Sequence, residues 1–363
     1  MNRRRKKKTA NVLSFYLLIT AILSGCSGHG EQVSEKSYEE VCSDGTVVNE
    51  EPENVDVSSD ELPEKELYGV EVTVSEQPEK ELYGIEAAAS EQPEGTPFEN
   101  EAPAVEIIET DWSQYFGSLN GAAVIYDSSE GTCMIYNEEL ATTRRSPCST
   151  FKIISSLLAL ENGILDAADS VRAWSGEIFW NENWNRDIDF ADAFRTSCVW
   201  YFREVIDEIG KDRMQAGLEK ISYGNCDISD WEGRLNTNNN NRALTGFWIE
   251  SSLQISPREQ TEVMERIFGN NADYAAETIN RLKQVMLVEE PISGQNGANL
   301  SVYGKTGMGK AQGVTVDAWF TGFAETPAGN LYFCVYLGQT DGMNVTSSAA
   351  KEIALRILAD YHS

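Results

Sequence analysis

The segment "SVYGKTGMGKAQGVTVDAWFTGFAETPAGNLYFCVYLG", residues 301–338, contains three successive strand patterns: "SVYGKTGMG", "TVDAWFTGFAE" and "LYFCVYLG". A helical pattern, "SSAAKEIALRILADY" at 347–361, follows them. Further towards the amino terminus, "GAAVIYDSSEGTCMIYN" at 121–137 predicts a β-hairpin around a Ser-Ser-Glu-Gly turn. Strands therefore begin and end this part of the chain, and we expect the two groups to share one sheet.

The sequence between the predicted strands is mainly helical. Pro147 opens a helix whose apolar pattern continues until Gly163 weakens it. Further helices are predicted near 190–209, 257–268 and 273–286. The last two stretches include a natural cap, Ser256, followed by a natural first helical residue, Pro257. The predicted fold class is α+β, with an antiparallel sheet from the amino- and carboxyl-terminal segments packed against helices, and a mostly helical subdomain.

Residues 1–25 are predicted to be a lipoprotein signal peptide. Six basic residues, Arg3 to Lys8, precede an apolar stretch from Val12 to Leu23, which is the pattern of a secretory signal. The stretch ends in "LSGC", which resembles the processing site where a diacylglycerol is attached to a cysteine, here Cys26. An ordinary signal peptide or a single membrane helix is the alternative, but small residues directly precede Cys26 and favour lipidation. We expect an exported protein, lipid-anchored to the outer face of the cell membrane.

Residues 26–110 are predicted to be the lipidated cysteine followed by an acidic, disordered repeat linker. From residue 27 to 110 there are 24 acidic residues against three lysines, a net charge of −21 out of −29 for the whole chain. A repeat with Pro63, Pro78 and Pro93 in register holds too few apolar side chains to offset the chain entropy lost on folding. A repeat that binds a cell wall or a partner is the alternative to a spacer.

Residues 111–363 are predicted to be one catalytic domain, large enough for a hydrophobic core. The chain's two histidines, His29 and His362, lie outside the domain core, which argues against Ser-His-Asp and Cys-His catalysis and against a histidine-ligated metal. The domain's cysteines form no CxxC pair, so no zinc site is expected, and a disulfide is permitted without any pair being indicated. A net charge of −14 and the lack of a glycine-rich phosphate loop argue against nucleic-acid binding. The remaining chemistry is that of lysine or carboxylate.

The motif "STFK", residues 149–152, places Ser149 and Lys152 one turn apart on the same helix face. The amine can reach the hydroxyl, and backbone N–H groups at the helix start can stabilise a developing oxyanion. Ser-x-x-Lys often occurs by chance, and a capped helix with a solvated lysine is the alternative. Lys152, however, lies in an apolar helix, where desolvation lowers the pKa of an unpaired ammonium. A neutral Lys152 is a base and also a nucleophile towards carbon dioxide.

Four more short motifs follow "STFK" in order: "SCV" at 197–199, "YGN" at 223–225, "FW" at 247–248 and "KTG" at 305–307. Together they resemble the class D serine β-lactamases, in a lipoprotein form. The segments "ISPREQ" at 255–260 and "AWFTGF" at 318–323 are also similar to that family. The resemblance covers essentially all of 111–363 and implies the β-lactamase/transpeptidase-like fold of the penicillin-recognising serine hydrolases.

The resemblance implies catalytic roles for three residues. Ser149 would be the nucleophile that opens the β-lactam and forms an acyl-enzyme. Lys152 would be carbamylated to N6-carboxylysine and act as the general base for acylation and deacylation, while Ser197 would relay a proton to the leaving nitrogen. The implied carbamate pocket consists of Phe151, Val199 and Trp248, whose indole N–H would donate to the carbamate.

The resemblance also implies a substrate-binding set, which comprises Lys305, Thr306, Gly307, Met308, Tyr223 and Asn225. Lys305 and Thr306 would hold the substrate carboxylate, and the backbone N–H groups of Ser149 and Met308 would form the oxyanion hole. "ESSLQ" at 250–254 looks like the "ExxLN" of class A enzymes, whose glutamate helps to activate the deacylating water. Glu250 is set aside because "SCV" replaces the class A "SDN".

Two features depart from the class D pattern. "CDISDWEGRLNTNNNNRALTG", 226–246, lengthens the stretch between "YGN" and "FW", which affects the rim of the pocket and the range of substrates. Many class D enzymes also supply an arginine from the last helix to the substrate carboxylate. The matching region here reads "SSAAKEIALR", so Lys351, Arg356 or neither takes that place.

The predicted function is hydrolysis of β-lactam antibiotics, giving antibiotic resistance. The alternative is a penicillin-sensing domain that is acylated without turnover, and a third reading, a cell-wall transpeptidase or carboxypeptidase, is disfavoured by "YGN" with "FW". The expected partners are small-molecule β-lactams and, through the lipid, a membrane. No metal or cofactor is expected except carbon dioxide or bicarbonate for Lys152, and the oligomeric state is open. Cys148 and Cys198 are expected to be small buried hydrophobic residues.

Overall fold

The computed structural model describes residues 105–361, apart from residues 167, 237–238, 289–291 and 294–298. The predicted signal peptide, the lipidation site Cys26, the acidic repeats and both histidines lie outside the described residues. Within the part that is described, no helix is both long and apolar enough to cross a membrane.

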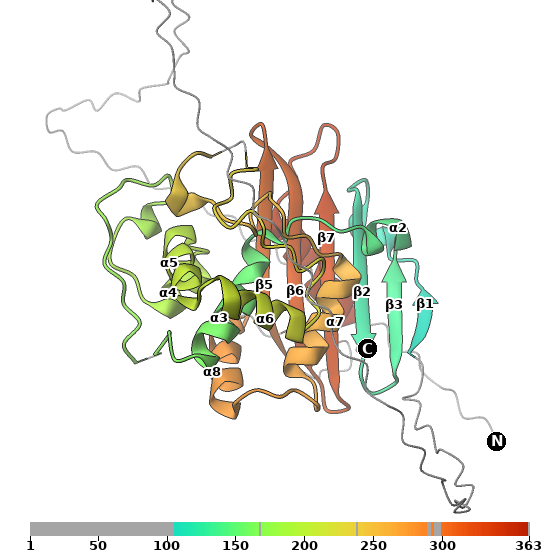
Figure 1. Ribbon diagram of the computed structural model, residues 1–363. Coiled ribbons are helices and arrows are strands. Elements are labelled where there is room, and N and C mark those ends of the chain that lie inside the picture. Colours follow the sequence, from blue (N-terminus) through green and yellow to red (C-terminus); the bar gives the residue numbers. More distant parts are fainter. Residues whose placement is uncertain (1–104, 167, 237–238, 289–291, 294–298, 362–363) are drawn as a thin grey trace, which may run out of the picture. The chain divides into compact units, whose positions relative to one another are not determined.

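The described strands form one sheet in the order β1-β3-β2-β7-β6-β5-β4 (Figure 1). In chain order they are β1 (Glu106–Glu109), β2 (Gly121–Asp127), β3 (Thr132–Tyr136), β4 (Ile292–Ser293), β5 (Asn299–Ala311), β6 (Val314–Glu325) and β7 (Asn330–Gly338). Strand β2 pairs antiparallel with β7, from Gly121 opposite Leu337 to Asp127 opposite Leu331. This pairing joins the two ends of the domain, so the predicted sheet shared by the terminal segments is confirmed.

Strand β1 differs from the prediction. It pairs parallel with β3, whereas the other strand pairs of the sheet are antiparallel. It also lies before residue 111, so the folded region begins a few residues earlier than the predicted domain boundary. All four residues of β1 are exposed and two are glutamates, so their composition does not distinguish them from the acidic segment that precedes them.

The helices lie on both faces of the sheet and beside it. The α-helices are α1 (Ser113–Phe116), α2 (Glu138–Thr142), α3 (Lys152–Glu161), α4 (Phe190–Arg195), α5 (Val199–Ile209), α6 (Lys211–Lys220), α7 (Pro257–Phe268), α8 (Ala276–Met286) and α9 (Ser347–Tyr361), and the 3-10 helices are η1 (Cys148–Phe151), η2 (Glu182–Trp184) and η3 (Arg242–Leu244). Helix α9 packs against β5, β6 and β7, while α7 packs against β7 and β2. Helices α3 to α6 and α8 gather beside β5 as the helical subdomain (Figure 1).

Local sequence explains where several helices begin and end. Helix α7 starts with a capping box, because the Ser256 hydroxyl accepts from the Glu259 N–H and the Glu259 carboxylate accepts from the Ser256 N–H. Helix α3 ends before Gly163, which adopts a φ of 64°. The helical stretch predicted at 190–209 is two helices, separated at Ser197, whose φ of 58° no α-helix contains.

The sheet and the helical subdomain meet where β5 passes η1. A Cβ atom on Gly307 would lie 3.0 Å from both the Pro147 carbonyl oxygen and Thr150 Cγ2, so only glycine allows this close approach. The largest apolar core fills the helical subdomain and contains Phe151 and Trp248, and a second core lies between the sheet and α9. Residues 148–152 and the middle of β5 are thereby held side by side.

Candidate active site

Ser149 and Lys152 lie together at the junction of η1 and α3. Lys152 Nζ donates a hydrogen bond of 3.1 Å to Ser149 Oγ. The lysine side chain is 1% exposed, and its Nζ lies 5.3 Å from the centroid of the Phe202 ring. Burial lowers the pKa of Lys152 to about 8. Within the described part of the chain no carboxylate pairs with this amine, so about a tenth of Lys152 is unprotonated at pH 7 and about half at pH 8.

Aromatic side chains enclose the pocket around Lys152. The rings of Phe151 and Trp248 are buried and stack with their centroids 6.0 Å apart. Phe202 completes the pocket and was not predicted, although its position three residues after Val199 places both on one face of α5.

Ser197 and Lys305 form the second polar pair of the site. The Lys305 Nζ donates to Ser197 Oγ over 2.5 Å and to the Thr306 carbonyl over 3.1 Å. Lys305 is 5% exposed, and burial, together with the charge of Lys152, holds its pKa well below the usual range. The structure therefore brings together all three predicted catalytic residues and the lysine of "KTG".

A cleft of about 410 Å³ opens above Ser149. Its polar floor is Ser149, and its walls include Val199 and Met308, both predicted site residues. Met308 is 39% exposed, and Trp180, which the sequence analysis did not identify, is more exposed still. Ser149 and Met308, whose N–H groups are the predicted oxyanion donors, thus face one cavity.

Glu250 lines the same cleft, although it was set aside on sequence. Its carboxylate accepts from the backbone N–H of Lys310 on β5, and its own N–H donates to Ser146 Oγ over 2.8 Å. Glu250 connects the loop after Trp248 to strand β5, which carries Met308 and its predicted oxyanion-binding N–H. With φ values of 51°, 58° and 50°, Cys148, Ser197 and Glu250 all occupy the left-handed region, a form of backbone strain that collects at functional sites.

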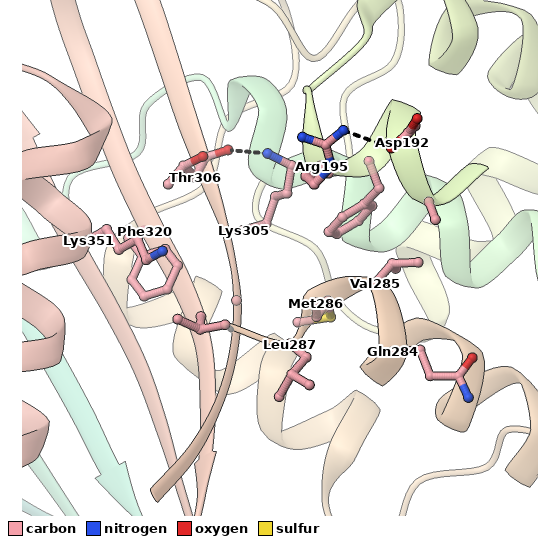
Figure 2. A pocket seen from close by; sticks show the side chains of 14 residues that line it. Asp192, Arg195, Gln284, Val285, Met286, Leu287, Lys305, Thr306, Phe320 and Lys351 are labelled. Atoms are coloured by element: carbon pink, nitrogen blue, oxygen red, sulfur yellow. Dashed lines mark hydrogen bonds and ion pairs between the residues drawn. The ribbon is translucent and has the colours of Figure 1, made fainter. Parts of the chain in front are cut away.

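A second cavity, of about 530 Å³, lies at the edge of β5 next to Lys305 and Thr306. Figure 2 shows Arg195 from α4 and Lys351 from α9 around it. Lys351 has no hydrogen-bond or ion-pair partner among the described residues, whereas Arg195 pairs with Asp192. Arg356, the other candidate for the missing arginine, lies over the Tyr115 ring at 5.3 Å and does not line this cavity. Of the two predicted candidates, only Lys351 approaches the "KTG" strand.

Tyr223 and Asn225 were predicted to bind substrate, and the structure places neither of them in the cleft at Ser149. Tyr223 is fully buried behind Phe151, with ring centroids 5.6 Å apart. Asn225 Nδ2 donates to the Ser252 carbonyl, and its Oδ1 accepts from the Gln254 N–H. Neither residue lines the cleft at Ser149, so the "YGN" motif supports the site from behind rather than contacting a ligand.

The cysteines beside the site are packing residues. Cys148 and Cys198 are buried, and all the cysteines in the described residues are free thiols. Burial raises the pKa of Cys198 to about 11 and that of Cys148 well above the usual range, so both thiols are protonated. No disulfide therefore constrains the described part of the domain.

Comparisons with known proteins agree with this geometry. A family profile described as "Penicillin binding protein transpeptidase domain" matches residues 121–359. The chain is 35% identical over 258 residues to "Regulatory protein BlaR1" of Bacillus licheniformis, covering 70% of this chain but only 39% of the relative. It is 30% identical over 251 residues to "Probable beta-lactamase YbxI" of Bacillus subtilis, covering 68% of this chain and 82% of the relative.

The fold is similar to solved structures as well. The C-terminal domain of the Bacillus licheniformis BlaR penicillin receptor superposes with a TM-score of 0.59 at 33% identity, covering 70% of this chain and 96% of that domain. The relatives therefore include a penicillin receptor and a probable β-lactamase at comparable identity.

Proposed function

Since this chain belongs to the family of penicillin binding protein transpeptidase domains, we propose that it is a class D β-lactamase that hydrolyses β-lactams through an acyl-enzyme on Ser149. One observation carries the proposal: the Lys152 amine is buried without a carboxylate partner and lies 3.1 Å from Ser149 Oγ. A lysine in this state has the protonation and the position of a general base.

Acylation follows from the two polar pairs. Lys152 removes the proton of Ser149, whose Oγ attacks the β-lactam carbonyl while the N–H groups of Ser149 and Met308 stabilise the oxyanion. The carbonyl–nitrogen bond of the ring then breaks. The leaving nitrogen receives through Ser197 the proton that Lys152 took from Ser149, so the Lys152 amine is neutral again, and the Lys305 Nζ holds Ser197 by a hydrogen bond. Ring opening leaves an ester on Ser149.

Deacylation requires a base that activates water, and a carbamate on Lys152 supplies it. The neutral amine adds to carbon dioxide, loses a proton and becomes an N-carboxylate. Burial in the aromatic pocket lowers the pKa of the amine, so more of it is neutral than of a solvated lysine, and the indole N–H of Trp248 would donate to a carbamate oxygen. The carbamate takes a proton from water as the water oxygen attacks the ester, and it returns that proton to the departing Ser149 oxygen, which restores both the hydroxyl and the carbamate.

The substrate carboxylate would lie along β5. Thr306 and Lys305 are on the strand itself, and Lys351 reaches the same cavity from α9. Lys351 therefore takes the place of the arginine that many class D enzymes supply. The proposal also includes export and a lipid anchor at Cys26, which rest on the amino-terminal sequence alone.

A penicillin-sensing domain is the second candidate, favoured by the 35% identity to BlaR1. A sensor retains the acyl group, whereas an enzyme releases it. The test is mass spectrometry of the protein over time after one equivalent of benzylpenicillin in bicarbonate buffer. The proposal predicts a penicilloyl adduct that disappears as the free enzyme returns, with no adduct on Ser149→Ala. An adduct that persists for hours would support the sensor instead.

A further inference from the structure

Arg203 is a buried cation next to the Lys152 pocket. Its side chain on α5 is 3% exposed. The guanidinium lies between two indoles, 5.2 Å from the ring centroid of Trp231 and 5.1 Å from that of Trp248. The Trp248 indole is thus enclosed by the Phe151 ring and by the guanidinium of Arg203.

Arg203 also attaches the long segment 226–246 to the helical subdomain. It donates to the Trp231 carbonyl over 2.9 Å and pairs with Asp207 one turn along α5. Asp207 in turn accepts from the Trp231 indole N–H and from Arg242. The Trp231 ring stacks on Phe247, with centroids 5.2 Å apart. The inserted segment therefore packs directly onto the "FW" motif.

The Arg203 guanidinium pairs with Asp207, and a second ion pair, Arg242 with Glu232, lies in the same cluster. Asp207, its carboxylate partner, has a side chain that is 40% exposed, so water screens the carboxylate more than it screens the buried guanidinium. A cation over an indole face is favourable and polarises the ring, which strengthens the N–H as a donor.

We propose that Arg203 is a positioning residue for a carbamylated Lys152: it fixes the Trp248 indole against the pocket, and its charge over that indole strengthens the N–H that would donate to the carbamate. This role depends on the carbamate of the proposed function. Trp231, which follows the "YGN" motif, acts through Arg203, because its ring lies 5.2 Å from the guanidinium and its carbonyl accepts from it. We expect the contact between Arg203 and Trp248 to affect the bicarbonate affinity of Lys152 and to leave the rate of acylation unchanged.

The test is a titration of the full chain with ¹³C-bicarbonate. The carbamate resonance in the NMR spectrum measures how much of Lys152 is carbamylated at each concentration. Arg203→Met keeps much of the volume and removes the charge, so the bicarbonate midpoint should rise about tenfold, the equivalent of about one pKa unit of interaction. Arg203→Lys keeps the charge and should stay within about threefold of the parent. Arg258→Met, an arginine on the exposed side of α7, is the matched control and should leave the midpoint unchanged.

Two outcomes would overturn this role: an unchanged midpoint in Arg203→Met, or equal losses in Arg203→Met and Arg203→Lys, which would indicate packing without charge. If Arg203→Met does not fold, Trp231→Leu serves instead, since it uncovers the guanidinium and should raise the midpoint by roughly threefold; no rise would count against Arg203. Absence of a carbamate resonance in the parent at saturating bicarbonate would contradict the carbamate base of the proposed function itself.

Discussion

The Lys152 amine and the Ser149 hydroxyl lie 3.1 Å apart in a pocket where aromatic rings, and no carboxylate of the described residues, surround the amine. In water an isolated lysine is protonated at neutral pH, and only desolvation makes this one a base. The chemistry of Ser149 therefore depends on the protonation and modification of its neighbour. The following predictions test this dependence.

Replacing Lys152 by alanine should abolish deacylation, because Lys152 is the side chain that hydrogen-bonds to Ser149 Oγ among the described residues. Steady-state turnover should fall by at least about a thousandfold, the typical scale of a lost general base, and any acyl-enzyme that forms without this base should persist in mass spectra. Lys211→Ala, an exposed lysine on α6, is the control and should turn over normally. Substantial turnover by Lys152→Ala would exclude the lysine as base.

The uptake of carbon dioxide should depend on pH with a midpoint near 8. Below its pKa of about 8, Lys152 is an ammonium and cannot attack carbon dioxide; above it, the neutral amine predominates. At a fixed concentration of dissolved carbon dioxide, the rate of reactivation should rise roughly tenfold between pH 7 and pH 9 and then level off. Stopped-flow reactivation of the decarbamylated protein measures this rate. A midpoint near 10.5 would show that burial leaves the amine unperturbed.

Trp248→Phe should weaken bicarbonate binding while leaving the aromatic packing largely in place. The substitution removes the indole N–H, a donor to a charged acceptor, and should raise the bicarbonate midpoint by at least about tenfold. Trp112→Phe in the core between the sheet and α9 is the control, since it changes a remote buried tryptophan. An unchanged midpoint in Trp248→Phe would limit Trp248 to packing.

Lys351→Ala should impair substrates that carry a free carboxylate. Loss of a charge-assisted contact should reduce the acylation efficiency about tenfold for benzylpenicillin. Its methyl ester, which lacks the charge, should be acylated equally by the variant and the parent. Arg356→Ala removes the other candidate cation, which lies over Tyr115, and should change neither rate. Equal losses for the acid and the ester would show that Lys351 does not bind the carboxylate.

Much of the fold could be predicted from the sequence, because β-hairpins and helix caps depend on residues that are close together in the chain. The hairpin of β2 and β3 and the start of α7 at Pro257 follow from neighbouring residues alone. Strand β1 escaped prediction because its side chains are exposed and form no buried pattern. The break at Ser197 is a left-handed backbone conformation, which no letter of the sequence specifies.

Site residues were predicted correctly where a short motif fixes their relative positions. They were not predicted where contacts between distant segments determine which side chains reach the site. Ser149 and Lys152 share a helical turn, so their contact follows from spacing. Lys351 and Arg356 are five residues apart on one helix and therefore face different directions, but only the packing of α9 decides which reaches β5. Glu250 enters the cleft through a backbone turn, so sequence comparison with another class could not place it.

The most direct test of the account counts the molecules of a chromogenic β-lactam hydrolysed per molecule of protein, with bicarbonate removed and then restored. We expect many turnovers in bicarbonate, a fall towards a single stoichiometric burst after decarbamylation, and recovery when bicarbonate returns. A single burst under both conditions would contradict hydrolysis and identify a sensor. Many turnovers at the same rate with and without bicarbonate would contradict the proposal that a carbamylated Lys152 is the base.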